Sequence, residues 1–177
     1  GQFTNPMVLR VPGLAYQNGF GGHFHNDNSL TIFRDIPGLI LAVPSNGADA
    51  SRMLRTAVRE AYGNGRVVVF VEPIALYMAK DLYEPKDGKW VFQYPDLDEE
   101  IPLGKFSEYG NGKTLTIITY GNGLYVSLQA KKEIEKKLKK KIKVIDLRWL
   151  SDINIQKLLN AIGTCKNVLI VDECRRT

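Results

Sequence analysis

The run VVVFV at residues 67–71 constrains the fold more than any other feature of this chain. A continuous apolar run of this length is typical of a strand buried on both faces, as in parallel sheets covered by helices. A second run, LILAV at 39–43, precedes a helical pattern that Ser45 or Asn46 would cap. That pattern places five apolar residues on one side: Met53, Leu54, Ala57, Val58 and Ala61. The sequence thus predicts a strand–helix–strand unit whose strands are parallel neighbours.

Residues 79–110 differ in character from the chain on either side. They contain Pro85, Pro95 and Pro102, a cluster of acidic residues and no sustained periodicity, so we interpret them as a linker. The alternation of strands and helices resumes after them. Strands are expected at 114–119, 143–147 and 168–172, and helices at about 124–140 and 153–162, the second introduced by Ser151 and Asp152.

This alternation predicts an α/β protein with two three-layer parallel-sheet domains, residues 1–78 and residues 111–177. The chain begins without Met close to a strand-like MVLR, and it ends shortly after another strand. We therefore expect a fragment of a larger protein.

The charge pattern argues against a nucleic-acid or membrane partner. The chain carries 24 Lys and Arg against 19 Asp and Glu, and much of the excess lies in residues 131–143. There Ile134 and Leu138 predict a helix with one buried stripe and a solvated face. No aromatic side chains are interleaved with the lysines, as single-stranded nucleic acid would require.

Cysteine content and hydropathy narrow the cellular setting. Cys165 and Cys174 are too few for a disulfide scaffold or a zinc knuckle. No apolar run approaches the roughly 20 residues of a membrane helix. We expect a cytoplasmic protein, or one of the mitochondrial matrix if the source is eukaryotic.

Two glycine motifs resemble nucleotide-binding loops but lack required positions. GNGKT at 110–114 has Ser107 where a phosphate-binding loop needs its first glycine, and it leads into a strand. GNG at 121–123 follows a strand and precedes a helix, but Val126 occupies the third glycine position of a dinucleotide fingerprint. We interpret it as a tight turn at the carboxyl end of a strand, where ligands could still gather.

The two histidines, His23 and His25, lie in the glycine-flanked stretch GGHFHNDNSL. In an extended segment they would share a face with Asp27, which makes metal ligation one possibility. A structural role is a second possibility. Acid–base or hydrogen-bonding work is a third, because a histidine with a pKa near ~6.5 on a scaffolded loop suits proton transfer.

Several ordered blocks point to a known family. The first half contains MVLR, then His25 and Ser29, then IPGL at 36–39, VPSNGADA at 43–50, and FVEP with LY at 70–77. This order resembles the beta subunit of the thiamine diphosphate-dependent 2-oxo acid dehydrogenases. Those subunits commonly read His-Ser-Gln-Ser twelve residues before a Pro-Gly, and here His25 stands twelve residues before Pro37.

The second half supports the same resemblance. It contains IPLGK at 101–105, TIITYG at 116–121, KVIDLRWL at 143–150 and VLIVDE at 168–173. These blocks resemble the transketolase C-terminal domain of the same subunits. The resemblance implies that residues 1–78 are the later part of a transketolase-like pyrimidine-binding domain. It also implies that residues 111–177 are a transketolase C-terminal-like domain, incomplete at its end.

The resemblance also implies a function. It implies that this chain is the beta portion of a decarboxylating component. The whole component oxidatively decarboxylates a 2-oxo acid and transfers the acyl group to lipoamide. The implied cofactors are thiamine diphosphate and Mg²⁺, bound mainly by parts outside this chain, so the chain alone is not expected to be active. The implied partners are an alpha subunit or alpha-like domain and a dihydrolipoyl acyltransferase core, in a homo- or hetero-oligomer.

By the same resemblance, His25 is the catalytic histidine of the active-site loop. Asn26, Asp27 and Asn28 depart from the usual Ser-Gln-Ser. His23 has no family counterpart, and we interpret it as a hydrogen-bonding neighbour. We assign no cofactor-binding or metal-binding residue. Two alternatives stay open: a transketolase-type enzyme of ketol transfer, and a non-catalytic assembly domain.

Overall fold

The computed structural model describes residues 4–14 and 29–173, and its first sheet has three parallel strands. Strand β3 (Val67–Pro73) lies in the centre, between β1 (Met7–Gly13) and β2 (Ile40–Ala42). The register pairs Met7 with Val67 and Ile40 with Val68. Four consecutive residues of β3, from Val68 to Val71, are buried. The predicted parallel pairing of LILAV with VVVFV is confirmed.

Helices cover both faces of this sheet. Helix α3 (Gly47–Asn64) packs Met53 and Ala57 against Val68 and Phe70 of β3. The short helix α2 (Leu30–Arg34) packs on the opposite face. Asn46 is the N-cap of α3, because its side chain accepts a hydrogen bond from the backbone N–H of Asp49 at 2.9 Å.

The predicted apolar side of α3 is only partly buried. Met53, Ala57 and Ala61 are buried, Leu54 is half-buried, and Val58 is 52% exposed. The stripe predicted from sequence is therefore too wide. The sheet beneath α3 has three strands, and Val58 is not among the residues of the apolar clusters packed on it.

The second sheet has four strands in the order β4-β6-β5-β7. Strands β5 (Thr116–Thr119), β6 (Lys143–Asp146) and β7 (Val168–Ile170) are parallel, as predicted. The edge strand β4 (Ser107–Tyr109) is antiparallel to β6, and its residues belong to the segment interpreted as linker. The sheet thus includes a strand that the sequence pattern did not reveal.

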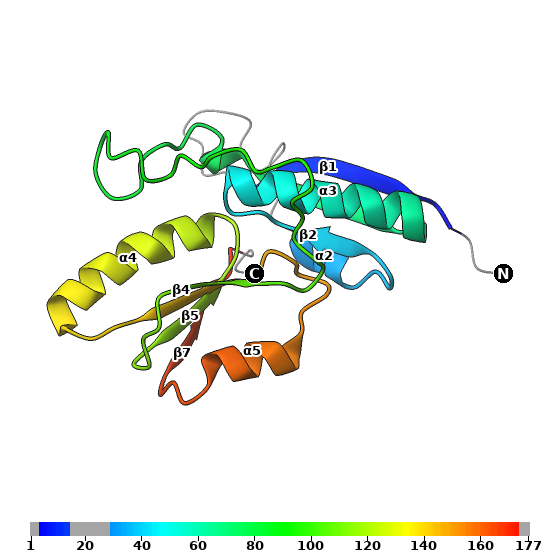
Figure 1. Cartoon of the computed structure of the whole chain (residues 1–177). Coiled ribbons are helices and arrows are strands. Elements are labelled where there is room, and N and C mark those ends of the chain that lie inside the picture. The colour runs from blue at the N-terminus through cyan, green and yellow to red at the C-terminus, as the bar shows by residue number, and fades with distance from the viewer. Residues whose placement is uncertain (1–3, 15–28, 174–177) are drawn as a thin grey trace.

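Two helices flank the second sheet on opposite sides, α4 (Asn122–Leu138) and α5 (Ile155–Ile162) (Figure 1). Ile134 of α4 packs against the core, but Leu138 is 58% exposed, so the predicted buried stripe ends one turn early. Leu138 is the last residue of the helix, and the fully buried residues of α4 all lie between Asn122 and Leu128. Helix α5 is capped by Asn154 and not by Ser151 or Asp152.

The segment 79–110 is largely irregular but packs closely. Leu82 and Trp90 join the core of the second sheet, and Ile101 joins the core beneath α3. Both long helices hold it: Arg55 of α3 donates to the carbonyl of Glu99 at 2.9 Å, and Gln129 of α4 donates to that of Leu82 at 2.6 Å. In the described part of the chain, no helix combines the length and apolar character needed to cross a membrane.

The two sheets are joined through the residues that follow β6. Ala42 of β2 forms an antiparallel bridge with Trp149, which is fully buried. Val43 donates to the carbonyl of Arg148 at 2.7 Å, and Leu150 donates to that of Leu41 at 2.8 Å. These backbone bonds fix the position of one sheet relative to the other.

Candidate functional site

The carboxyl end of β1 directly precedes residues 15–28, which contain the predicted catalytic histidine, and Ser29 directly follows them. Leu14 follows β1, is fully buried and has a φ of +49°, in the left-handed region that residues with a Cβ rarely adopt. His23 and His25 lie within residues 15–28, outside the described residues. The catalytic assignment of His25 therefore stays a prediction, as do the other possible roles of the histidine pair.

The GNG turn of the second sheet contacts Leu14 directly. The side-chain amide of Asn122 donates to the carbonyl of Leu14 at 2.5 Å. Gly121 has a φ of +53°, and a Cβ placed there would lie 2.7 Å from Cδ1 of Leu14. The interpretation of GNG as a tight strand-to-helix turn agrees with this geometry, since Gly123 donates to the carbonyl of Tyr120 at 3.0 Å.

Acidic side chains lie beside this turn, after β7. The hydroxyl of Tyr120 donates to Asp172. Burial, together with this bond to Asp172, raises the pKa of the Tyr120 hydroxyl. Burial also raises the pKa of Glu173 to about 7, although a hydrogen bond with Asn122 opposes that change. The carboxyl ends of β1, β5 and β7 thus bring together an amide, a phenol and two carboxyl groups.

A buried charge network lies where β2 ends and β6 ends. Ser45 donates to Asp146 at 2.8 Å, and the guanidinium of Arg148 binds Asp49 at 2.6 Å. Asp146 is fully buried, and its second oxygen lies 4.0 Å from Nε of Arg148. Burial raises the pKa of Asp146 to about 7, against the opposing effects of Arg148 and Ser45. Two carboxyl groups therefore share one guanidinium across the junction of the sheets.

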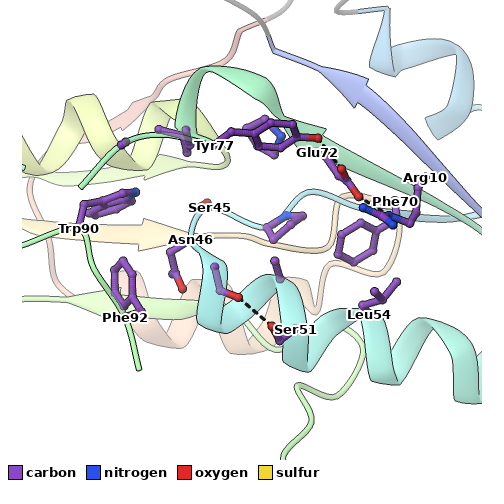
Figure 2. A pocket seen from close by; sticks show the side chains of 16 residues that line it. Arg10, Ser45, Asn46, Ser51, Leu54, Phe70, Glu72, Tyr77, Trp90 and Phe92 are labelled. Carbon is purple, nitrogen blue, oxygen red and sulfur yellow. Dashed lines mark hydrogen bonds and ion pairs between the residues drawn. The ribbon is translucent and has the colours of Figure 1, made fainter. Parts of the chain in front are cut away.

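A cavity of about 390 Å³ opens on the α3 side of the first sheet. Figure 2 shows Ser45 and Asn46 at the start of α3, and Glu72 and Tyr77 around the end of β3. Two aromatic side chains of the segment 79–110 complete the lining. Those rings are Trp90 and Phe92, which meet edge to face with centroids 5.3 Å apart.

Glu72 organises the polar wall of this cavity. It accepts hydrogen bonds from Arg10 and from the hydroxyl of Tyr77. Burial favours the neutral carboxyl group, but these two bonds outweigh it, so the pKa of Glu72 lies below its usual value. Burial and the bond to Glu72 raise the pKa of Tyr77 to about 12.

The described residues do not match the needs of thiamine diphosphate and Mg²⁺. Arg10 is the one cation that lines the cavity, and Glu72 already pairs with it, so a diphosphate there would meet a carboxylate. Within the described part of the chain, no three His, Cys, Asp or Glu side chains could together hold a metal ion.

Several of these contacts were not anticipated from sequence. The network of Asp146 and Arg148 joins residues about 100 positions away, and the only signal in the sequence is the Asp that ends the strand KVID. The GNG turn was recognised as a place where ligands could gather, but its contact with Leu14 was not. Glu72 lies in the FVEP block, where periodicity gives no indication of its partners.

Comparison with known proteins shows which families this chain resembles. Residues 104–177 match the family described as transketolase, C-terminal domain. The whole chain is 32% identical over 178 aligned residues to the mitochondrial 2-oxoisovalerate dehydrogenase subunit beta of Dictyostelium discoideum, covering 100% of this chain and 44% of the relative. It is 31% identical to the pyruvate dehydrogenase E1 component subunit beta of Acholeplasma laidlawii, covering 98% and 48%.

The chain is therefore a relative of the beta subunits of 2-oxo acid dehydrogenases, and it spans about half their length. A solved structure titled "Split gene transketolase, inactive beta4 tetramer" superposes with a TM-score of 0.67 at 18% identity, covering 94% of this chain and 47% of that one. This likeness shows the fold alone. Residues 104–177, which match the transketolase C-terminal domain, contribute the GNG turn and Arg148, while the sheet before them contributes Leu14 and most of the cavity lining.

Proposed function

We propose that the chain is the beta portion of a 2-oxo acid dehydrogenase decarboxylating component. The complete component would oxidatively decarboxylate a 2-oxo acid and pass the acyl group to lipoamide. The observation that carries the proposal is similarity over 98–100% of the chain to beta subunits of two such dehydrogenases. The fold supports it, because both sheets bring polar groups to the carboxyl ends of their parallel strands, where ligands of such folds bind.

The proposal assigns chemistry and binding to different parts of the assembly. His25 is the catalytic residue of this chain, an imidazole suited to moving a proton near neutral pH. Thiamine diphosphate, with its Mg²⁺, supplies the electron sink for decarboxylation and is held mainly by other parts. The partners are an alpha subunit or alpha-like domain and a dihydrolipoyl acyltransferase core. We also propose the division into residues 1–78, a linker at 79–110, and 111–177.

The test is activity of the assembled protein. The chain would be tagged in its native cells, purified with its partners, and assayed for release of CO₂ from pyruvate, 2-oxoisovalerate and 2-oxoglutarate. Release from at least one acid that depends on thiamine diphosphate, together with acylation of a lipoyl acceptor, is the expected result. The 177-residue chain, purified alone, serves as the control. Calorimetry should then show no sub-micromolar affinity for thiamine diphosphate with Mg²⁺.

Two other outcomes would contradict the proposal. Ketol transfer between sugar phosphates, without decarboxylation of any 2-oxo acid, would identify a transketolase-type enzyme. A stable complex that is inactive in both assays while its partners are saturated with cofactor would identify a non-catalytic assembly role.

A further inference from the structure

The cavity on the α3 side of the first sheet has the size and the lining of a small-molecule site. Its volume of about 390 Å³ lies within the range of ~300–1,000 Å³ that is typical of such sites. Most of the residues around it are apolar, and the largest are Leu54, Phe70, Trp90 and Phe92 (Figure 2). The walls therefore suit a ligand with an apolar body.

The apolar walls are largely preformed. Phe70 of β3 is 2% exposed and belongs to the core beneath α3. Trp90 is 6% exposed, and its ring meets that of Tyr125 on α4 edge to face, with the centroids 5.1 Å apart. Phe92 is 40% exposed, so a ligand in the cavity would remove apolar surface from water without rebuilding the walls.

One cation and one anion face this cavity. Arg10 of β1 and Glu72 of β3 are the only charged side chains among the described residues that line it. Hydrogen bonds from Arg10 and Tyr77 hold the pKa of Glu72 below its usual value, so Glu72 is ionised at neutral pH. Burial raises the pKa of Tyr77 to about 12, so the Tyr77 hydroxyl stays neutral. The wall thus has adjacent opposite charges and no net charge.

Both charged groups have capacity for a further partner. Arg10 donates to Glu72 through Nε, and its side chain is 62% exposed, so its terminal N–H groups can reach a ligand carboxylate. A carboxylate has about four acceptor positions, and Glu72 accepts from Arg10 and Tyr77. A ligand with a single charge would meet a like charge here, whereas a ligand with one charge of each sign would meet two opposite ones.

We propose that this cavity binds a zwitterionic α-amino acid that has an apolar side chain. Arg10 binds the carboxylate of the amino acid, and Glu72 binds its ammonium group. The apolar side chain packs between Phe70 and the rings of Trp90 and Phe92. This site is independent of the proposed function, because it uses neither His25 nor thiamine diphosphate.

The test is calorimetry on the assembled protein, purified with its partners, with leucine, phenylalanine and 4-methylpentanoate as separate ligands. The last compound is leucine without its ammonium group. At least one of the two amino acids should bind with a Kd below about 1 mM. 4-Methylpentanoate should bind at least ~10-fold more weakly than leucine, because its carboxylate meets Glu72 without a compensating ammonium. The tighter amino acid shows whether the cavity prefers an aliphatic or an aromatic side chain.

Glu72→Gln tests the recognition of charge. Glutamine keeps the shape of the side chain but not its charge, so the affinity for leucine should fall at least ~10-fold and that for 4-methylpentanoate should rise. Glu100→Gln is the matched control: Glu100 is 26% exposed, against 19% for Glu72, and it also pairs with an arginine, Arg59, but it does not line the cavity. Its binding of all three ligands should equal that of wild type.

Ala50→Leu tests the location of the site. Ala50 of α3 lines the cavity, so a leucine there should occupy the ligand's space and lower the affinity for both amino acids at least ~10-fold. Val58→Leu, at an exposed position of the same helix outside the cavity, should bind like wild type. A thermal melt of each variant shows that it is folded.

Three results would overturn the proposal. The first is the absence of saturable binding of both amino acids at concentrations up to about 10 mM. The second is equal affinity of wild type for leucine and 4-methylpentanoate, because an ammonium group would then contribute nothing. The third is an unchanged affinity for leucine in Glu72→Gln, and this result decides the matter even if Ala50→Leu does not fold.

Discussion

The guanidinium of Arg148 lies 2.6 Å from Oδ2 of Asp49, joining the segment that follows β6 to the start of α3. Both side chains are at most 10% exposed. Removing one member of a buried ion pair typically costs ~3–5 kcal/mol, because the remaining charge is left uncompensated. Arg148→Met should lower the free energy of unfolding by about that amount, since it leaves Asp49 and Asp146 facing each other.

Arg59 provides the matched control for this measurement. Its ion pair with Glu100 also joins α3 to a distant segment, but its side chain is 52% exposed. Exposed pairs contribute about 0–1 kcal/mol, so Arg59→Ala should change stability little. Urea unfolding of both variants gives the comparison. Equal losses for Arg148→Met and Arg59→Ala would show that burial of the Arg148 pair does not matter.

The stability of the protein should fall as pH rises from about 5 to 8. Burial raises the pKa of Asp146 to about 7, above the ~3.9 of an unfolded aspartate, so the folded state binds the extra proton. Its contribution is complete below about pH 4 and is lost as pH rises through 7. Carboxyl groups with lowered pKa values, such as Glu72, titrate below this window.

Asp146→Asn should flatten this dependence without removing it. The pKa of Glu173 is also raised to about 7, so Glu173 keeps a slope of the same sign in the variant. The charged and titratable groups around Asp146 are Arg148, Asp49 and Tyr109, which the substitution leaves in place. Urea midpoints at several pH values would check this. A wild-type stability that rises between pH 5 and 8 would contradict it.

Gly123→Ala should destabilise the protein despite the better helix propensity of alanine. A Cβ at position 123 would lie 1.9 Å from Oγ1 of Thr119, a buried side chain on β5. Relieving that overlap should cost ~1–3 kcal/mol, more than the ~1 kcal/mol gained in propensity. Gly63→Ala in α3 is the control, because nothing lies within 4 Å of its Cβ. Thermal melts should show a lower Tm for the first variant and an equal or higher Tm for the second.

His25→Ala should impair the assembled enzyme far more than His23→Ala. Loss of a positioned acid–base group typically costs ~10²- to 10⁴-fold in rate, whereas loss of a hydrogen-bonding neighbour costs much less. The measurement is steady-state turnover with a lipoyl acceptor, beside a thermal melt of each variant. Near-normal turnover of His25→Ala, or a lower melting temperature as its only effect, would refute the catalytic assignment.

Local patterns predicted most of the regular structure for identifiable reasons. The run 67–71 can satisfy its backbone and bury every side chain only as a central parallel strand, and it is β3. Asn46 caps α3 because its side chain reaches the N–H of Asp49 within the same turn. The sequence pattern does not predict strand β4, because its three residues, SEY, are as short and as polar as a turn. Only their pairing with β6 makes them a strand.

The sequence by itself determined the two runs of alternating strands and helices, the pairing of the parallel strands and the resemblance to the beta subunits. Each of these depends on residues close in sequence, or on apolar runs that have one way to be buried. Only the tertiary structure decided that Asn122 holds the carbonyl of Leu14 and that Arg148 pairs with Asp49. Both contacts join residues about 100 positions apart, and their geometry arises from the docking of one sheet on the other. The hydrophobic periodicity of a local segment carries no information about how the two sheets pack together.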